Sequence, residues 1–238
     1  MKIKTLLTIA VLTALTINAT TAQNTISKKY TYRDTTVAEF YKVTVSSAIN
    51  VIYRQNSDSS QIARIYASNN TAGIVKLKVQ DGNLNIKYGK EYTKDFGIIV
   101  VYIYSKSLIS VDCSGGGVFS TDGTVSGSFV SLKVTGDSQI RCTQLKYNNI
   151  KGRRGIGRGD LIIGGTADMA ELSILGRGEI NAENLITDDI KGRIFGTGDI
   201  GCNVNKSIEI NGIGRGAAYC KGALEISGKS SKIKKMVK

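Results

Sequence analysis

The stretch IGRGDL at Ile156–Leu161 is one of five copies of the motif that decides the fold of this 238-residue chain. The copies read TGDSQI at 135–140, IGRGDL at 156–161, LGRGEI at 175–180, FGTGDI at 195–200 and IGRGAA at 213–218. Their opening glycines follow one another at intervals of 18 to 21 residues. A fixed period of this length is typical of a repeat protein.

Apolar residues alternate with other residues after each opening glycine. Four residues after each opening glycine stands an apolar residue, namely Ile140, Leu161, Ile180, Ile200 or Ala218. The residue six positions after the glycine is also apolar in every copy. A period of two predicts a short strand in each copy. Stacked coils of 18–21 residues would align these positions as inward columns, so we expect an all-β fold, namely a single-stranded parallel β-helix or solenoid.

The paired glycines are expected to act as structural turns. A small coil must reverse sharply, and glycine adopts backbone angles with φ > 0 at little steric cost. Where glycine recurs, stacked corners could also lie backbone to backbone. The turn glycines are Gly136, Gly157, Gly159, Gly176, Gly178, Gly196, Gly198, Gly214 and Gly216.

The two ends of the chain and its regularity suggest a simple domain organisation. Residues 1–22 have the basic start, apolar stretch and small residues of a secretory signal peptide. Residues 23–238 are predicted to form one β-helix domain, with less regular coils over 30–112 and regular Gly-x-Gly coils over 113–238. No later segment has the apolar length of a transmembrane span, so we expect an exported protein in the periplasm, at the cell surface or outside the cell.

Charge and composition restrict the class of partner. The formal net charge is +13, of which two charges belong to Lys2 and Lys4 of the signal peptide. Such an excess favours polyanions, and export argues against nucleic acid. The lysines of the last ten residues are expected to be a solvated cap at the open end of the solenoid, with contact to an anionic glycan as the alternative.

The four cysteines, Cys113, Cys142, Cys202 and Cys220, leave two alternatives open. Cys202 and Cys220 occupy the same position in adjacent copies, so their α-carbons lie near the range that a disulfide accepts. Side chains of directly stacked strands point the same way, however, which favours a buried column of unbridged cysteines. The chain contains no histidine and no Cys-x-x-Cys pair, so no metal site and no cofactor are expected.

Charged residues beside the turn glycines form a possible surface ladder. Its members are Arg158, Asp160, Arg177, Glu179, Asp199 and Arg215. Ion pairs that fix the register of the coils are the simpler interpretation. Acid–base catalysis on an acidic polysaccharide is the alternative. Without histidine no Ser-His-Asp or Cys-His site can form, and no catalytic residue is predicted.

Four stretches resemble the head GIN domain family of autotransporter adhesins, which is common in exported proteins of Bacteroidetes. They are FYKVTVSSAINVIYRQ (Phe40–Gln55), VQDGNLNIKY (Val79–Tyr88), SLISVDCSGGG (Ser107–Gly117) and YCKGALEISGKSS (Tyr219–Ser231), besides the Gly-x-Gly corners. The resemblance covers nearly all of the mature chain. It implies a single-chain right-handed parallel β-helix and an adhesin, with no catalytic residue set.

These observations predict an exported, non-enzymatic module of the cell envelope that acts as an adhesin or contacts a glycan. The expected partner is an anionic glycan or another envelope protein. Two alternatives stay open: a β-helix lyase or hydrolase of acidic polysaccharides, and a periplasmic structural module that binds a protein partner.

Overall fold

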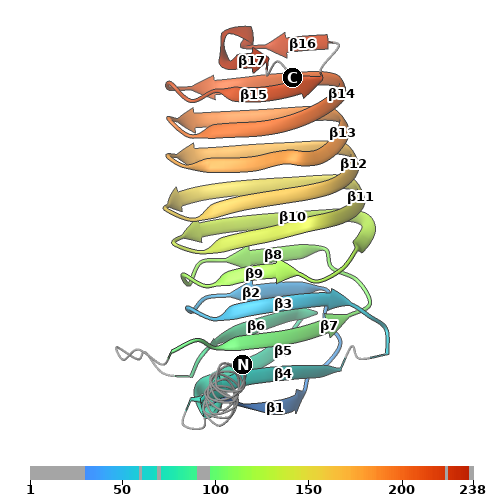
Figure 1. The fold of residues 1–238 in the computed structure, drawn as a ribbon, viewed down its shortest axis with the longest axis vertical. Coiled ribbons are helices and arrows are strands. Elements are labelled where there is room, and N and C mark those ends of the chain that lie inside the picture. Colours follow the sequence, from blue (N-terminus) through green and yellow to red (C-terminus); the bar gives the residue numbers. More distant parts are fainter. Residues whose placement is uncertain (1–29, 59–60, 69–70, 90–96, 223–224, 236–238) are drawn as a thin grey trace, which may run out of the picture.

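The computed structural model describes residues 30–235 apart from 59–60, 69–70, 90–96 and 223–224, so the expected signal peptide lies outside the described residues. These residues form strands, two short 3₁₀ turns and no α-helix, arranged as a β-solenoid of about 6 turns (Figure 1). This confirms the expected all-β solenoid. In the described part of the chain no helix is long and apolar enough to span a bilayer.

The N-terminal strands are β1 (Tyr30–Thr36), β2 (Lys42–Val45), β3 (Asn50–Gln55), β4 (Ile62–Ser68), β5 (Val75–Gln80), β6 (Asn83–Tyr88), β7 (Val100–Ser105), β8 (Ser110–Cys113) and β9 (Val118–Thr121). The C-terminal strands are β10 (Val125–Gly136), β11 (Gln139–Gly157), β12 (Asp160–Gly176), β13 (Glu179–Gly196), β14 (Asp199–Ile213), β15 (Ala218–Gly222), β16 (Glu225–Gly228) and β17 (Ile233–Lys235). The 3₁₀ turns are η1 (Ala72–Ile74) and η2 (Ser230–Lys232).

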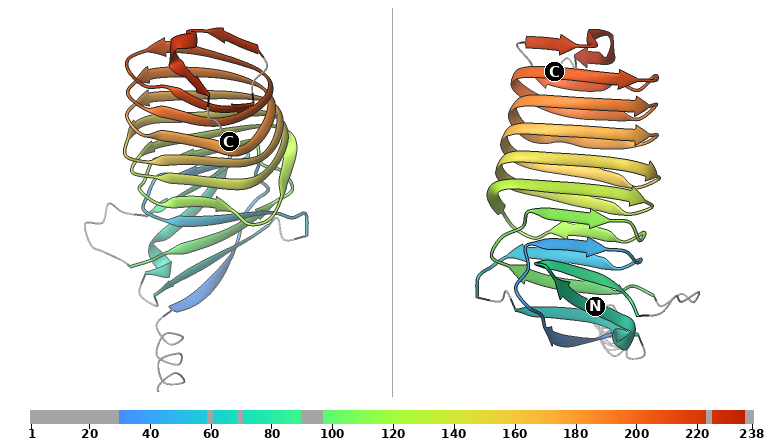
Figure 2. Two further views of the ribbon diagram at one scale, coloured as in Figure 1. Left: turned by 45° about the horizontal axis from the view of Figure 1, so that its top comes forward. Right: turned by 180° about the vertical axis from the view of Figure 1, so that it is seen from behind.

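Strands β11 to β14 each make one coil, which bends over at one edge of the solenoid and ends at the opposite edge (Figures 1 and 2). Neighbouring coils pair in parallel over most of their length, with register shifts near the bends. The expected inward column stacks in register from Ile140 to Leu161, Ile180, Ile200 and Ala218. All five side chains are buried, so this column forms part of a continuous core between the two layers.

A second inward column alternates large and small residues. It runs Leu132, Gly152, Leu172, Gly192 and Ile210, paired in register. A Cβ atom on Gly192 would lie 2.3 Å from the Cδ1 atom of Ile210. The glycines therefore leave the space that their larger neighbours fill, which is a common solution for a tightly packed core.

Backbone lies directly on backbone at the corners of Gly157, Gly196 and Gly214, whereas Gly176 has open space around its Cβ position and Gly178 meets the side chain of Arg154. Gly157 has φ of 135°, and a Cβ atom there would lie 2.0 Å from the carbonyl oxygen of Gly136 in the preceding coil. A Cβ atom on Gly159 would meet the carbonyl oxygen of Ser138, also at 2.0 Å. Because real Cβ atoms do not approach so closely, only glycine allows these corners to stack at the spacing of paired strands.

Two buried cations bind the carbonyl groups of corners. Arg154 occupies an otherwise apolar inward column and donates to the carbonyl oxygens of Gly157 (2.7 Å) and Gly159 (2.9 Å). Burial lowers the pKa of this guanidinium from its usual value, and the charge of Asp160 opposes the shift. Lys232 makes the equivalent contacts at the last corner, where its Nζ atom lies 2.9 and 3.0 Å from the carbonyl oxygens of Gly214 and Gly216. Lys232 is thus a buried cap and not the solvated one expected.

The N-terminal strands do not stack in the order of the sequence. Strand β2 lies between β6 and β8, and β3 lies between β7 and β9, all in parallel. Strands β5 and β6 form an antiparallel hairpin, and β4 pairs antiparallel with both β1 and β7. The hairpin turn, Asp81-Gly82, has φ of 52° and 68°, as a tight two-residue connection requires. Residues 30–112 are therefore not a simple series of successive coils.

The cysteines differ from the favoured expectation as well. Cys202 and Cys220 form a disulfide between stacked positions, with their Cα atoms 4.8 Å apart. This distance is within the accepted range, and both side chains point into the same core, which brings the sulfur atoms together. Cys113 and Cys142 are buried free thiols, and burial raises the pKa of Cys142 to about 12.

We expect Gly157→Ala to lower the free energy of unfolding by about 3 kcal/mol or more, because it combines an unfavourable φ with a backbone clash. Gly176→Ala is the matched control, since Gly176 has φ of 92° but open space around its Cβ position. The control should lose only the backbone component, about 1 kcal/mol. Urea unfolding measures both, and equal losses would show that the close approach of the coils is unimportant.

Replacing both Cys202 and Cys220 by serine should lower the free energy of unfolding by about 3 kcal/mol, because the bridge closes a short loop in the unfolded chain. Reductant should destabilise the native protein and leave the double variant unaffected. Alkylation of the unfolded, unreduced protein, followed by mass spectrometry, should modify only the thiols of Cys113 and Cys142. Modification of all four cysteines would contradict the bridge.

Candidate anion-binding groove

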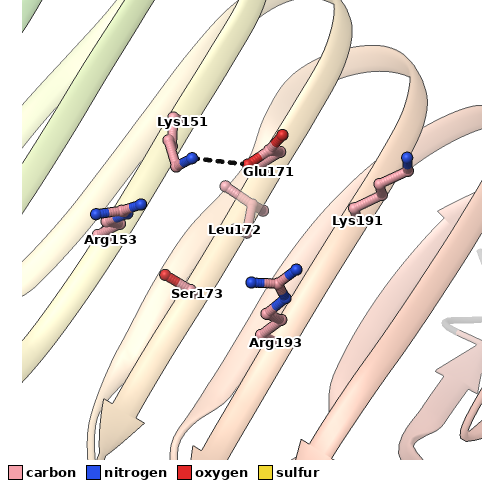
Figure 3. A pocket seen from close by; sticks show the side chains of 7 residues that line it. All are labelled: Lys151, Arg153, Glu171, Leu172, Ser173, Lys191 and Arg193. Carbon is pink, nitrogen blue, oxygen red and sulfur yellow. Dashed lines mark ion pairs between the residues drawn. The ribbon is translucent and has the colours of Figure 1, made fainter.

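A groove of about 200 Å³ crosses the outer face of β11, β12 and β13. Figure 3 shows its lining side chains, which come from three consecutive coils. They are Lys151, Arg153, Glu171, Leu172, Ser173, Lys191 and Arg193. Four cations thus surround one carboxylate and one hydroxyl group.

The strand register places these side chains in two outward columns. Lys151 pairs with Glu171, which pairs with Lys191. Arg153 pairs with Ser173 in the next coil, and Ser173 pairs with Arg193 in the coil after it. The backbones of the two arginines are therefore about 9.6 Å apart, two strand spacings, with the serine between them (Figure 3).

The carboxylate of Glu171 neutralises only one of the four cations. The Nζ atom of Lys151 lies 3.0 Å from its Oε2 atom. This hydrogen bond lowers the pKa of Glu171, and the charges of Lys151, Arg193 and Lys191 lower it further. Lys191, Arg153 and Arg193 form no ion pair with any described residue. Glu171 therefore stays ionised over the neutral range.

Arg153, Ser173 and Arg193 are suited to hold an oxyanion. Guanidinium groups donate paired hydrogen bonds to carboxylate, sulfate or phosphate, and a serine hydroxyl adds a further donor. The groove is open, and among the described residues no side-chain acceptor forms an ion pair with Arg153 or Arg193. Nothing in it pairs a nucleophile with a base, and no three potential metal ligands come together in the described part of the chain.

The corner residues singled out in the sequence lie elsewhere. Glu179 and Asp199 stack in register as expected, but Asp199 accepts a hydrogen bond from the backbone N–H of Ala217 at 2.7 Å. Arg158 pairs with Asp137 of the preceding coil at 2.7 Å and not with an acid of the proposed ladder. Where the structure describes the chain, Arg177, Arg215, Asp160 and Glu179 form no ion pair. The ladder as a functional or register-fixing element stays a prediction.

The groove was missed in the sequence, although a signal for it exists. The tripeptide Lys-Gly-Arg occurs at 151–153 and again at 191–193, with Glu-Leu-Ser at the equivalent place of the coil between them. Its central residue belongs to the inward column, so lysine and arginine must both point outward. This repeat is harder to see than the corner glycines, because its two copies lie two coils apart and not in successive coils.

Comparison with known proteins agrees with the fold. The family described as "Putative auto-transporter adhesin, head GIN domain" matches residues 39–223. The crystal structure of a putative adhesin from Bacteroides fragilis is similar, with 26% identity and a TM-score of 0.78, over 87% of this chain and 94% of that one. No curated protein matches the chain.

Two structures from Parabacteroides distasonis share the fold at lower identity. One, a putative adhesin, has 21% identity and a TM-score of 0.70, over 87% of this chain and 97% of that one. The other, named a putative lipid binding protein, has 16% identity and a TM-score of 0.67, over 88% and 97%. The family match extends over more than three quarters of the sequence and over the Gly-x-Gly corners and the groove. The chain belongs to the head GIN domain family of auto-transporter adhesins.

Proposed function

We propose that this protein is an exported, non-enzymatic adhesin-type module of the cell envelope that binds an acidic glycan in the groove of Lys151, Arg153, Lys191 and Arg193. One observation carries the proposal: Arg153 and Arg193, which form no ion pair with any residue that the structure describes, flank Ser173 in one outward column of a rigid sheet. Stacked strands hold the backbone positions of these donors in place, so binding orders their side chains but costs little backbone entropy.

The geometry favours a linear polyanion. The solenoid axis runs along the columns, so a chain laid along it would meet Arg153 and, two coils further on, Arg193. The net charge of +13 draws polyanions toward the surface. Membership of an adhesin family supports a binding function, and the signal peptide expected at residues 1–22 would bring the groove to the glycans of the envelope.

Arg153→Gln combined with Arg193→Gln should weaken binding of chondroitin sulfate or polygalacturonate by about tenfold or more, because charge-assisted hydrogen bonds are lost. Arg177→Gln combined with Arg215→Gln is the matched control, with the same change in charge at exposed corner positions. Calorimetry should show near-native affinity for the control and no binding of neutral dextran. Equal losses in the two double variants would reduce the proposal to nonspecific charge attraction.

The adhesin function further predicts surface exposure. Protease added to intact cells should cleave the tagged protein while a periplasmic control protein stays intact. Protection until lysis would contradict direct adhesion and favour a periplasmic module with a protein partner.

A further inference from the structure

Four large apolar side chains are exposed along one edge of the solenoid. Ile156, Leu175, Phe195 and Ile213 each stand immediately before the opening glycine of a corner, and they are 73%, 49%, 46% and 71% exposed. We call these four residues the apolar edge. Core residues of the same strands, such as Ile174 and Ile194, are at most 1% exposed, so the apolar edge is distinct from the core.

The backbone places these side chains in one line. Leu175 pairs with Phe195, and Phe195 pairs with Ile213, while Ile156 takes the same place before Gly157 one coil earlier. At the spacing of paired strands the line is about 14 Å long. Strands β11 to β14 end at this edge, one above the other (Figures 1 and 2). The side chains therefore project from a corner where the chain reverses.

The groove lies next to the apolar edge on the same face. Arg193 precedes Phe195 by two residues of one strand, so both side chains point outward with Cα atoms about 6.6 Å apart. On the other side of the edge, acidic and basic corner residues offset one another, as in the pair Arg158–Asp137. The charge beside the apolar edge is thus positive on the groove side only.

The apolar edge and the cations beside it together indicate which kind of partner this surface fits. A projecting apolar line with cations beside it matches an anionic lipid surface, where apolar side chains enter the acyl boundary and cations meet the phosphate groups. A second copy of the chain docked edge to edge would bring two basic grooves together, and like charges oppose that contact. The projecting shape also suits a fluid surface better than the groove-filling contact of a peptide.

We propose that the protein docks on anionic membrane surfaces through the apolar edge, with Arg153 and Arg193 of the groove adding attraction to lipid phosphate. The inference goes beyond glycan binding and does not depend on it, because the four apolar side chains play no part in holding a soluble polyanion. Docking would lay the long axis of the solenoid along the membrane plane, since the edge runs parallel to the stacking direction.

The experiment compares vesicles with soluble polysaccharide. The mature protein, residues 23–238, is sedimented with vesicles of phosphatidylglycerol and phosphatidylcholine in equal parts, and with phosphatidylcholine alone. Ile156→Ser combined with Ile213→Ser removes the two most exposed members of the edge. We expect this variant to bind the anionic vesicles about tenfold or more weakly than the native protein, with unchanged affinity for chondroitin sulfate.

A matched control removes two exposed isoleucines elsewhere. Ile62→Ser combined with Ile98→Ser changes residues that are 43% and 63% exposed in the N-terminal part, away from the edge. The control should bind vesicles as the native protein does, and circular dichroism should show that both variants are folded. Arg153→Gln with Arg193→Gln should weaken binding of vesicles as well as of polysaccharide.

Each outcome bears on a different proposal. Native affinity of the edge variant for anionic vesicles, or equal losses in edge and control variants, would overturn docking through the edge. A native protein that binds polysaccharide but no vesicle would overturn docking and leave the glycan proposal standing. Vesicle binding that needs the edge, without any polysaccharide binding, would support docking and overturn the glycan proposal.

Discussion

Everything in this structure depends on the direct contact of backbone with backbone at the Gly-x-Gly corners. At Gly157 and Gly159 the carbonyl oxygen of the coil below takes the place where a side chain would begin. The hydrogen bond from the N–H of Gly159 to the carbonyl oxygen of Gly136, at 2.8 Å, then continues the ladder around the turn. The corners stack in this way at Gly157, Gly196 and Gly214, whereas the atoms nearest the Cβ position of Gly178 belong to the guanidinium of Arg154 and not to the backbone of the corner before it. Between the bends, the paired strands keep their register over several coils.

Because the coils stack in register, residues that recur with the period of the repeat form columns on the surface. Residues one repeat apart become neighbours in a column. A substitution in one copy of the repeat therefore changes one side chain in a straight column on the surface. The groove uses a column of arginine, serine and arginine, and the apolar edge uses the position directly before the glycine. The stacked strands fix the backbone positions from which such columns present donors or apolar side chains, so binding costs little backbone entropy and mainly orders side chains.

The repeat in the sequence predicted those parts of the fold that depend on local spacing. The inward column beginning at Ile140 was predictable because alternation with period two and a period near 20 suffice to place it. The insertion of β2 between β6 and β8 was not, because pairing across about 40 to 70 residues leaves no local signal. The groove depends on which columns face outward side by side. The bridge of Cys202 and Cys220 depends on which side chains meet in the core. Arg154 went unnoticed because hydrophobic patterning cannot anticipate a guanidinium satisfied by corner carbonyls.

The two ends of the solenoid differ from its sides in how their strand edges are covered. An uncapped coil would offer unpaired N–H and carbonyl groups to another copy and invite end-to-end stacking. At the C-terminal end, Lys232 occupies the carbonyl oxygens of the last corner, and the short strand β17 pairs with β15. At the other end, the antiparallel pairs β1–β4 and β5–β6 replace parallel coils and interrupt the pattern that a further coil would need (Figure 1). Within the described residues, these end strands break the regular stacking, whereas the lateral columns continue it from coil to coil. Among those columns, the groove and the apolar edge combine charge or apolar area with a fixed spacing, which is why we place the proposed contacts there.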